Sequence, residues 1–332
     1  MYDIFVIGSA TREVFLQSKA FTARNDASSE TGQVEVFPLG SKIEVDKIAF
    51  ASGGAGTNTA VTFARQGFKT VCVGVIGNDI SGHEILRELE AEGVNVDHFQ
   101  KHKDDYSAYS VVLVDKSGER TILTYKGEVR HFDANKIHFD KLVAGWCYID
   151  SLGGHFDVLE KTIAHCKKNK IKIAYNPGGK ELAFGLEKLK PQLEQVDVLF
   201  VNKNEGEGLL NQSGNSKQVA NELQKITKGI VSVSDGPRGV VVVDHEGSTY
   251  TAGIPDSPVI ERTGAGDAFG SGFVSQIMIN DKVQMSNDEK IIRAIQYGTA
   301  NASSVVTQFG AKAGILKKGD NGEWPMVEVK KI

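Results

Sequence analysis

The stretch that decides the fold is Glu261-Arg-Thr-Gly-Ala-Gly-Asp267, followed at once by the apolar run Ala268-Phe-Gly-Ser-Gly-Phe-Val274. Its two glycines let backbone N–H groups point at one spot without side chains in the way. The apolar run predicts a helix, so these N–H groups lie at a helix N-terminus, where anions bind. Asp267 suits a base that accepts a hydroxyl proton while the N–H groups stabilise a transferring phosphoryl group. A plain turn with Asp267 as an ordinary first-turn carboxylate is the alternative.

Composition excludes several classes of protein. The chain has 332 residues and a formal net charge of −4, which gives no support for a nucleic-acid or anionic-membrane partner. Its three cysteines, Cys72, Cys147 and Cys166, have neither disulfide-framework nor zinc spacing. The N-terminus does not resemble a signal peptide, and no uncharged run is long enough for a membrane span. We therefore expect a cytoplasmic protein.

Short apolar runs alternate with helical patterns along the chain. The apolar runs predict strands over residues 3–7, 70–75, 146–149, 172–175, 198–201, 230–234 and 240–243. Helices are predicted over residues 57–66, 81–92, 156–168, 216–225 and 289–308, the second with a capping box formed by Ser81 and Glu84. This order predicts a doubly wound α/β fold with a mostly parallel sheet flanked by helices.

Two stretches without a helical pattern interrupt this order. Residues 13–51 contain strand-like pieces at 14–16, 34–37 and 42–44, and residues 107–125 predict a hairpin of strands 110–114 and 120–124 around a turn at 115–118. Together they predict a small β-sheet lid over a main domain formed by residues 1–12, 52–106 and 126–332. Two unrelated edge hairpins are the alternative.

The predicted lid has a set of apolar side chains. Exposed strand edges with one apolar face are rarely left uncovered. The set that we expect to pack on a second copy of the chain, giving a homodimer, is Val14, Leu16, Val36, Val112 and Ile122.

Three more segments carry polar or glycine-rich patterns beside predicted strands and helices. Ser52-Gly-Gly-Ala-Gly-Thr-Asn58 opens a helix and lets the backbone approach a ligand, or is a tight turn capped by Thr57 or Asn58. Asn202-Lys-Asn-Glu205 follows a strand, where its amide and carboxylate suit a magnesium ion that keeps its waters. Two interpretations fit the segment Ser234-Asp-Gly-Pro-Arg-Gly239: it borders a bound nucleotide, or it is a plain turn between two strands.

In this order, these motifs resemble the ribokinase (PfkB) family of carbohydrate and nucleoside kinases over almost the whole chain. Gly310-Ala311 near the end belongs to the same resemblance. The resemblance implies a ribokinase-like fold, ATP as co-substrate and a β lid that often dimerises.

The resemblance also implies roles for individual residues. It makes Asp267 the catalytic base and the N–H groups of Gly264, Ala265 and Gly266 the anion hole. It implies contacts to the acceptor from Gly53, Gly54 and Asn58, and contacts to Mg²⁺ and the ATP phosphates from Asn202 and Glu205, through water for the metal. Ser234, Gly236 and Thr263 are the further nucleotide contacts.

This sequence departs from the family pattern at two carboxylates. Glu13 follows Gly8-Ser-Ala-Thr-Arg12 where the family usually has an aspartate that holds sugar hydroxyls. Glu261 stands where the family usually has an aspartate near a monovalent-cation site, and Arg262 replaces the threonine after it. We therefore expect Glu13 to bind the acceptor and Glu261 to be the candidate K⁺ residue.

The sequence thus predicts an ATP-dependent kinase acting on a hydroxyl of a small sugar, with a nucleoside kinase as the runner-up. Two alternatives belong to other classes. A nucleotide-dependent oxidoreductase lacks support because no Gly-x-Gly-x-x-Gly follows the first strand. A catalytically inactive sugar- or nucleotide-binding protein has no need of the base at Asp267.

Overall fold

The computed structural model describes residues 1–29, 31–115 and 119–332. A nine-stranded sheet has the order β17-β16-β15-β14-β13-β12-β11-β1-β6. Neighbours from β14 to β6 pair in parallel, and β15, β16 and β17 add an antiparallel edge. The strands are β1 (Tyr2–Ile7), β6 (Thr70–Val73), β11 (Ala144–Ile149), β12 (Lys172–Tyr175), β13 (Val198–Asn202), β14 (Ile230–Ser234), β15 (Val240–Val243), β16 (Thr249–Ala252) and β17 (Val329–Lys331).

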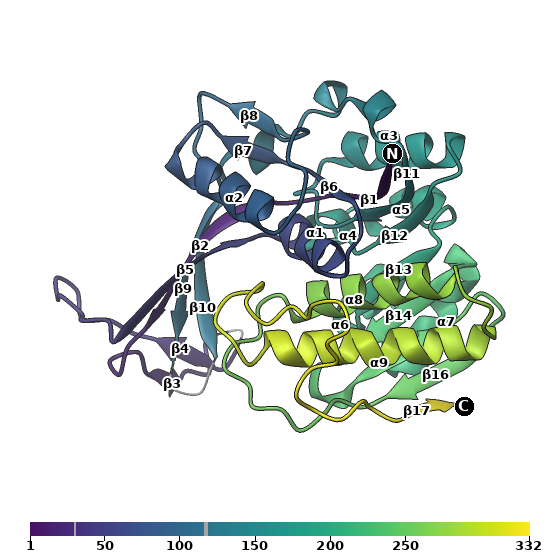
Figure 1. Ribbon diagram of the computed structural model, residues 1–332. Helices are drawn as coiled ribbons and strands as arrows, with labels where there is room; N and C mark the ends of the chain where they lie inside the picture. The colour runs from purple at the N-terminus through teal and green to yellow at the C-terminus, as the bar shows by residue number, and fades with distance from the viewer. Residues whose placement is uncertain (30, 116–118) are drawn as a thin grey trace.

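Helices cover both faces of this sheet (Figure 1). One core contains side chains of α1 (Ala55–Arg65), α2 (Ile80–Ala91), α8 (Ala265–Asn280) and α9 (Asn287–Val305). The core on the opposite face contains side chains of α3 (Phe156–Lys168), α5 (Gly185–Leu193), α6 (Lys203–Leu210) and α7 (Ser216–Thr227). The sheet with helices on both faces confirms the predicted doubly wound α/β fold.

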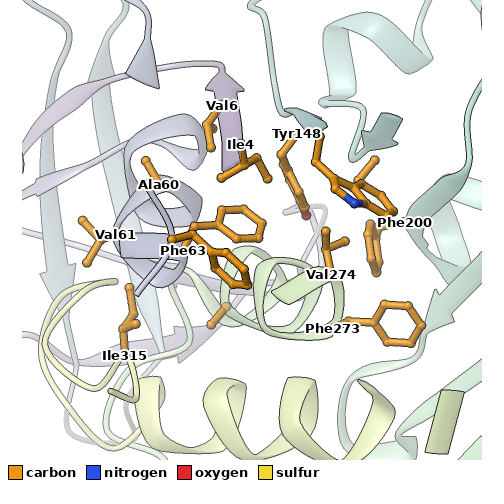
Figure 2. Packing of buried hydrophobic residues seen from close by; sticks show 14 of the residues in the cluster. Ile4, Val6, Ala60, Val61, Phe63, Tyr148, Phe200, Phe273, Val274 and Ile315 are labelled. Carbon is orange, nitrogen blue, oxygen red and sulfur yellow. The ribbon is translucent and has the colours of Figure 1, made fainter. Parts of the chain in front are cut away.

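A row of aromatic rings fixes α1 and α8 on the same face of the sheet. Phe63 of α1 packs on Tyr148 of β11, with ring centroids 5.7 Å apart. Tyr148 stacks on Phe200 of β13 at 6.1 Å, and Phe200 meets Phe273 of α8 at 5.7 Å (Figure 2). All four rings are buried. The two helices therefore pack in one core on the same face of the sheet.

The predicted element boundaries agree with the structure best in buried strands. Those predicted at 172–175, 230–234 and 240–243 coincide with β12, β14 and β15. The capping box of Ser81 and Glu84 is wrong, because α2 begins at Ile80 and its N-cap is Asp79. The Asp79 side chain accepts a hydrogen bond from Gly82 N at 2.8 Å and also holds Ser107.

A separate four-stranded sheet has the order β10-β9-β2-β5 and projects from the main body (Figure 1). It confirms the expected small β sheet and excludes two unrelated hairpins, because β2 pairs with β5 on one side and β9 on the other. Its strands are β2 (Thr11–Gln17), β5 (Lys47–Gly53), β9 (Tyr109–Val114) and β10 (Arg120–Tyr125). Residues 116–118 of the predicted turn lie outside the described residues.

Two predictions within the lid stretches are wrong in detail. Residues 42–44 form no strand, and the strand lies at β5 instead, where alternating Ile48 and Phe50 point to one face and Ala49 and Ala51 to the other. The expected piece at 34–37 is a short strand paired with a preceding one outside the lid sheet. The smaller elements are β3 (Ala23–Asn25), β4 (Gln33–Glu35), β7 (Val75–Gly77), β8 (Gln100–His102), α4 (Gly179–Leu182), η1 (Gly127–His131), η2 (Ala134–Lys136), η3 (Phe139–Lys141) and η4 (Gly236–Arg238).

The five apolar residues expected to form one lid face do not share a face. The strand register puts Val112 and Ile122 on the face that carries Glu13, which we call the inner face. Val14 and Leu16 lie on the opposite, outer face, and Val36 lies outside this sheet. The exposed apolar side chains of the outer face are Ile48, Phe50, Leu123 and Tyr125.

Candidate active site

The N-terminus of α8 carries the most specific motif of the chain. The helix begins at Ala265, with Gly264 as its N-cap at φ 79°, a left-handed conformation that favours glycine. A Cβ at Gly264 would also overlap Ala311, which explains why Gly310-Ala311 and the Gly-Ala-Gly motif belong together. Asp267 lies in the first helical turn. The N–H groups at the start of α8 and the Asp267 carboxylate are therefore adjacent, as the sequence predicts.

Asp267 is held by a residue that lies 209 positions earlier in the chain. Asn58 Nδ2 in α1 donates a hydrogen bond to Asp267 Oδ2 at 2.8 Å. Burial raises the pKa of Asp267, whereas this hydrogen bond and the charge of Lys312 oppose the rise. The structure therefore brings together the glycine-rich turn before α1 and the N-terminus of α8.

The glycine-rich turn is shaped by close packing against the segment that joins β1 to β2. A Cβ at Gly53 would overlap the Glu13 carboxyl, and a Cβ at Gly54 would lie 2.6 Å from Ser9 O. Gly54 caps α1 at φ 90° with no side-chain cap, so capping by Thr57 or Asn58 is wrong. Both glycines are needed by the fold itself, and this packing brings Glu13 into the same cluster.

Glu13 is buried in β2, with 7% of its surface exposed. Its Oε2 atom is buried and has no hydrogen-bond partner among the described residues. Burial raises the pKa of Glu13 to about 7, against the charge of Lys312, while Glu261 and Asp267 add to the rise. An unpartnered carboxylate oxygen in the cluster that contains Lys312 and Asp267 is suited to accept a hydrogen bond from a bound hydroxyl.

Sequence reasoning missed two buried charged residues at this site. Asp150 follows β11, and its Oδ2 atom is buried without a hydrogen-bond partner in the described part of the chain. Burial and then the charge of Asp267 raise the pKa of Asp150 well above its usual range. Lys312 donates to Asn58 Oδ1 at 2.8 Å. A single acid after a strand and one of several lysines near the chain end gave no sequence signal.

The candidate nucleotide residues lie at the carboxyl ends of two neighbouring strands. Asn202 of β13 and Ser234 of β14 are register partners, and Gly236 follows in η4. Asn202 and Glu205 form a reciprocal capping box at the start of α6, with Glu205 Oε2 accepting from Asn202 N at 2.8 Å. Burial raises the pKa of Glu205. Its second oxygen, Oε1, takes no part in this cap.

Glu261 is buried before α8 and already has partners for one of its oxygens. Oε1 accepts from the Thr263 N–H at 2.7 Å and from the Thr263 hydroxyl. Arg120 Nε of the lid lies 3.1 Å from the same oxygen. Thr263 therefore supports Glu261, whose second oxygen, Oε2, is buried without a hydrogen-bond partner among the described residues.

The described residues contain neither a cluster of metal-ligating side chains nor a membrane-spanning helix. No group of three or more metal-ligating side chains occurs within residues 1–29, 31–115 and 119–332. In the same residues, no helix is both long enough and apolar enough to cross a membrane.

Comparison with known proteins gives matches along almost the whole chain. Residues 3–318 match the model of the pfkB family carbohydrate kinases. Ribokinase of Bacillus subtilis is 26% identical over 96% of this chain and 98% of its own length. Ribokinase of Haemophilus influenzae is 27% identical over 82% of this chain and 87% of its own length. The solved ribokinase of Giardia lamblia superposes with a TM-score of 0.78 at 19% identity, covering 96% of this chain and 98% of its own.

Proposed function

This chain belongs to the pfkB family of carbohydrate kinases, which are phosphotransferases with an alcohol group as acceptor, and we propose that its acceptor is a small uncharged sugar. The single observation that carries the proposal is the contact between Asn58 and Asp267, which joins the acceptor motif to the anion site. Membership of this family makes the oxidoreductase alternative wrong. The retained carboxylate at Asp267, held by Asn58, supports an active kinase over an inactive binding protein.

In the proposed reaction, Asp267 is the base. Its carboxylate accepts the proton of the acceptor hydroxyl as that oxygen forms a bond to the γ-phosphorus of ATP. The bond between this phosphorus and the bridging oxygen breaks, and ADP leaves. The N–H groups of Gly264, Ala265 and Gly266 stabilise the charge on the phosphoryl oxygens. Asn58 keeps the Asp267 carboxylate in position.

The charges around Asp267 favour an uncharged acceptor. Three further carboxylates interact with this cluster: Glu13, Asp150 and Glu261. The nearby cation Lys312 has all three ammonium protons in hydrogen bonds to the protein, and Arg120 is paired with Glu261. The phosphate of a sugar phosphate would be repelled by these carboxylates. Among the described residues of the cluster, no unpaired cation is left to bind it. Glu13 and Asp150 instead suit neutral hydroxyls.

ATP is proposed to lie along the carboxyl ends of β13 and β14. Ser234, Gly236 and Thr263 would border the nucleotide, and Asn202 and Glu205 would orient waters on Mg²⁺. The ion would neutralise charge on the phosphates. The lid, proposed to comprise residues 13–51 and 107–125, would close over the acceptor and exclude water as a competing acceptor.

A nucleoside kinase is the second candidate, supported by one side chain on the lid. Ile122 lies on the inner face with Glu13 and is 44% exposed. An exposed aliphatic side chain there would pack against a base attached to the sugar.

A rate panel separates these candidates. ADP formation would be measured with Mg²⁺–ATP and D-ribose, D-fructose, fructose 6-phosphate, ribose 1-phosphate, adenosine, inosine or guanosine. We expect the highest kcat/KM with a free sugar. A nucleoside that exceeds every sugar would select the second candidate, and a preference for either sugar phosphate would contradict the charge argument.

A further inference from the structure

Lys312 is a buried cation to which the proposed phosphotransfer assigns no role. The residue follows Gly310-Ala311 and is 9% exposed. Its ammonium donates to Ser52 O, to Thr57 Oγ1 at 2.8 Å and to Asn58 Oδ1 at 2.8 Å. Because an ammonium has three protons, these acceptors leave none for a substrate.

The contact with Asn58 determines which way its amide faces. An ammonium can only donate, so it must meet the amide oxygen, and Nδ2 is then turned toward Asp267 Oδ2 at 2.8 Å. With the opposite orientation, the amide oxygen would face the Asp267 carboxylate, and two acceptors would repel each other. Lys312 thus acts on Asp267 through Asn58, without a direct hydrogen bond to it.

Lys312 also lies among carboxylates from several elements. The pKa of Lys312 is raised by the charges of Glu13 in β2, Glu88 in α2 and Asp267 in α8. The thiol of Cys72 in β6 has the same effect. The charge of Glu261 raises the pKa of Glu13. The charge of Asp267 raises the pKa of Tyr148 in β11 and of Asp150, which follows this strand. In return, Lys312 lowers the pKa of both Glu13 and Asp267 against the effect of burial. Burial lowers the pKa of Lys312 itself to about 8.

We propose that Lys312 is a positioning residue of this kinase: its ammonium orients the Asn58 amide toward Asp267 and adds a positive charge to the cluster that contains the Asp267 carboxylate. This rests on the proposed role of Asp267 as the base. Loss of the ammonium proton at high pH would weaken both effects, and loss of the residue would make Asp267 harder to ionise.

The test is the pH dependence of kcat/KM for the best acceptor of the panel, in four proteins. The wild type should give a bell-shaped profile whose alkaline limb lies near pH 8, where Lys312 loses its proton. Lys312→Arg stays charged, so the alkaline limb should disappear. Its planar fork does not match three acceptors around one point, so kcat should fall about 10-fold. Lys312→Met should move the acidic limb upward by about one pH unit, because an opposite charge is lost.

Lys317→Met is the matched control, because it removes a lysine charge from the same segment at an exposed position. It should keep the wild-type profile. An alkaline limb that survives in Lys312→Arg would overturn the proposal even where Lys312→Met does not fold. If Lys312→Met folds, an unmoved acidic limb would overturn it too. If Asp267→Asn is inactive while the Lys312 variants keep the wild-type profile, only the role of Lys312 is rejected. If Asp267→Asn is active, the proposed function itself is rejected.

Discussion

Arg120 Nε in lid strand β10 lies 3.1 Å from Glu261 Oε1, so an ion pair joins the lid to the loop before α8. The Glu261 side chain is 1% exposed and that of Arg120 is 26% exposed. A second pair with reversed charges, Glu119 and Arg262 at 3.5 Å, lies beside it but is largely exposed. The buried pair is therefore the one that should matter for activity, since exposed pairs contribute little.

The first prediction concerns monovalent cations. Arg120 already supplies a positive charge to Glu261, so replacing K⁺ by N-methylglucamine should change the wild-type rate less than about twofold. In Arg120→Gln the charge is lost, kcat/KM should fall about 10-fold or more, and K⁺ should restore part of the rate through Glu261 Oε2. Arg262→Gln, which affects only the exposed pair, is the control. Strong activation of the wild type by K⁺ would contradict this account.

The second prediction concerns the acceptor. Glu13→Gln removes a carboxylate proposed to accept hydrogen bonds from a sugar diol. A charge-assisted hydrogen bond contributes about 1.5–3 kcal/mol, so kcat/KM for the acceptor should fall about 10-fold or more. The KM for ATP should stay near its wild-type value. Equal changes for both substrates, or none for either, would remove Glu13 from the acceptor site and leave Asn58 as the main contact.

The third prediction concerns magnesium. Glu205→Gln keeps the size of the side chain but weakens its hold on metal-bound waters, so half-maximal activity should need more Mg²⁺. The measurement is a magnesium titration at fixed ATP. Glu207→Gln, two positions further along α6, is the matched control. An unchanged titration in the Glu205 variant would withdraw this residue from the site.

The fourth prediction concerns the outer face of the lid. Ile48, Phe50, Leu123 and Tyr125 are exposed there at 43–58%, and an apolar face of this kind marks an interaction surface. We propose that it packs on a second copy of the chain. Sedimentation at micromolar concentration should give a dimer for the wild type and a monomer for Leu123→Glu. Ile254→Glu, at an exposed apolar position outside the lid, should remain dimeric. A monomeric wild type would contradict the proposal.

The sequence predicts those parts of the fold that depend on local pattern. The short, largely apolar runs of β12, β14 and β15 have buried side chains on both faces, so their apolar pattern located them. The strand β5 was missed because Lys-Ile-Ala-Phe-Ala-Ser-Gly ends in small residues with weak strand preference. The N-cap of α2 was misplaced by two residues because Asp79 also binds Ser107, a partner that is distant in the sequence.

The candidate site likewise contains residues that a local sequence motif points to and residues that only the folded chain brings together. Glycine and acid motifs made Asp267, Asn58 and Glu205 candidates because the spacing within each motif is local. Lys312 was missed because a lysine in a polar tail is normally exposed, and only packing against α1 buries it. The Arg120–Glu261 pair was missed as well, because lid and loop meet only in the folded chain.

The most direct test of the central claim is the turnover of Asp267→Asn. Asparagine keeps the size of the side chain but cannot accept the hydroxyl proton. With the best acceptor of the panel, kcat should fall about 100-fold or more while ATP binding, measured by calorimetry, changes little. Near-normal turnover in a folded Asp267→Asn protein would contradict the assignment of Asp267 as the base and the mechanism built on it.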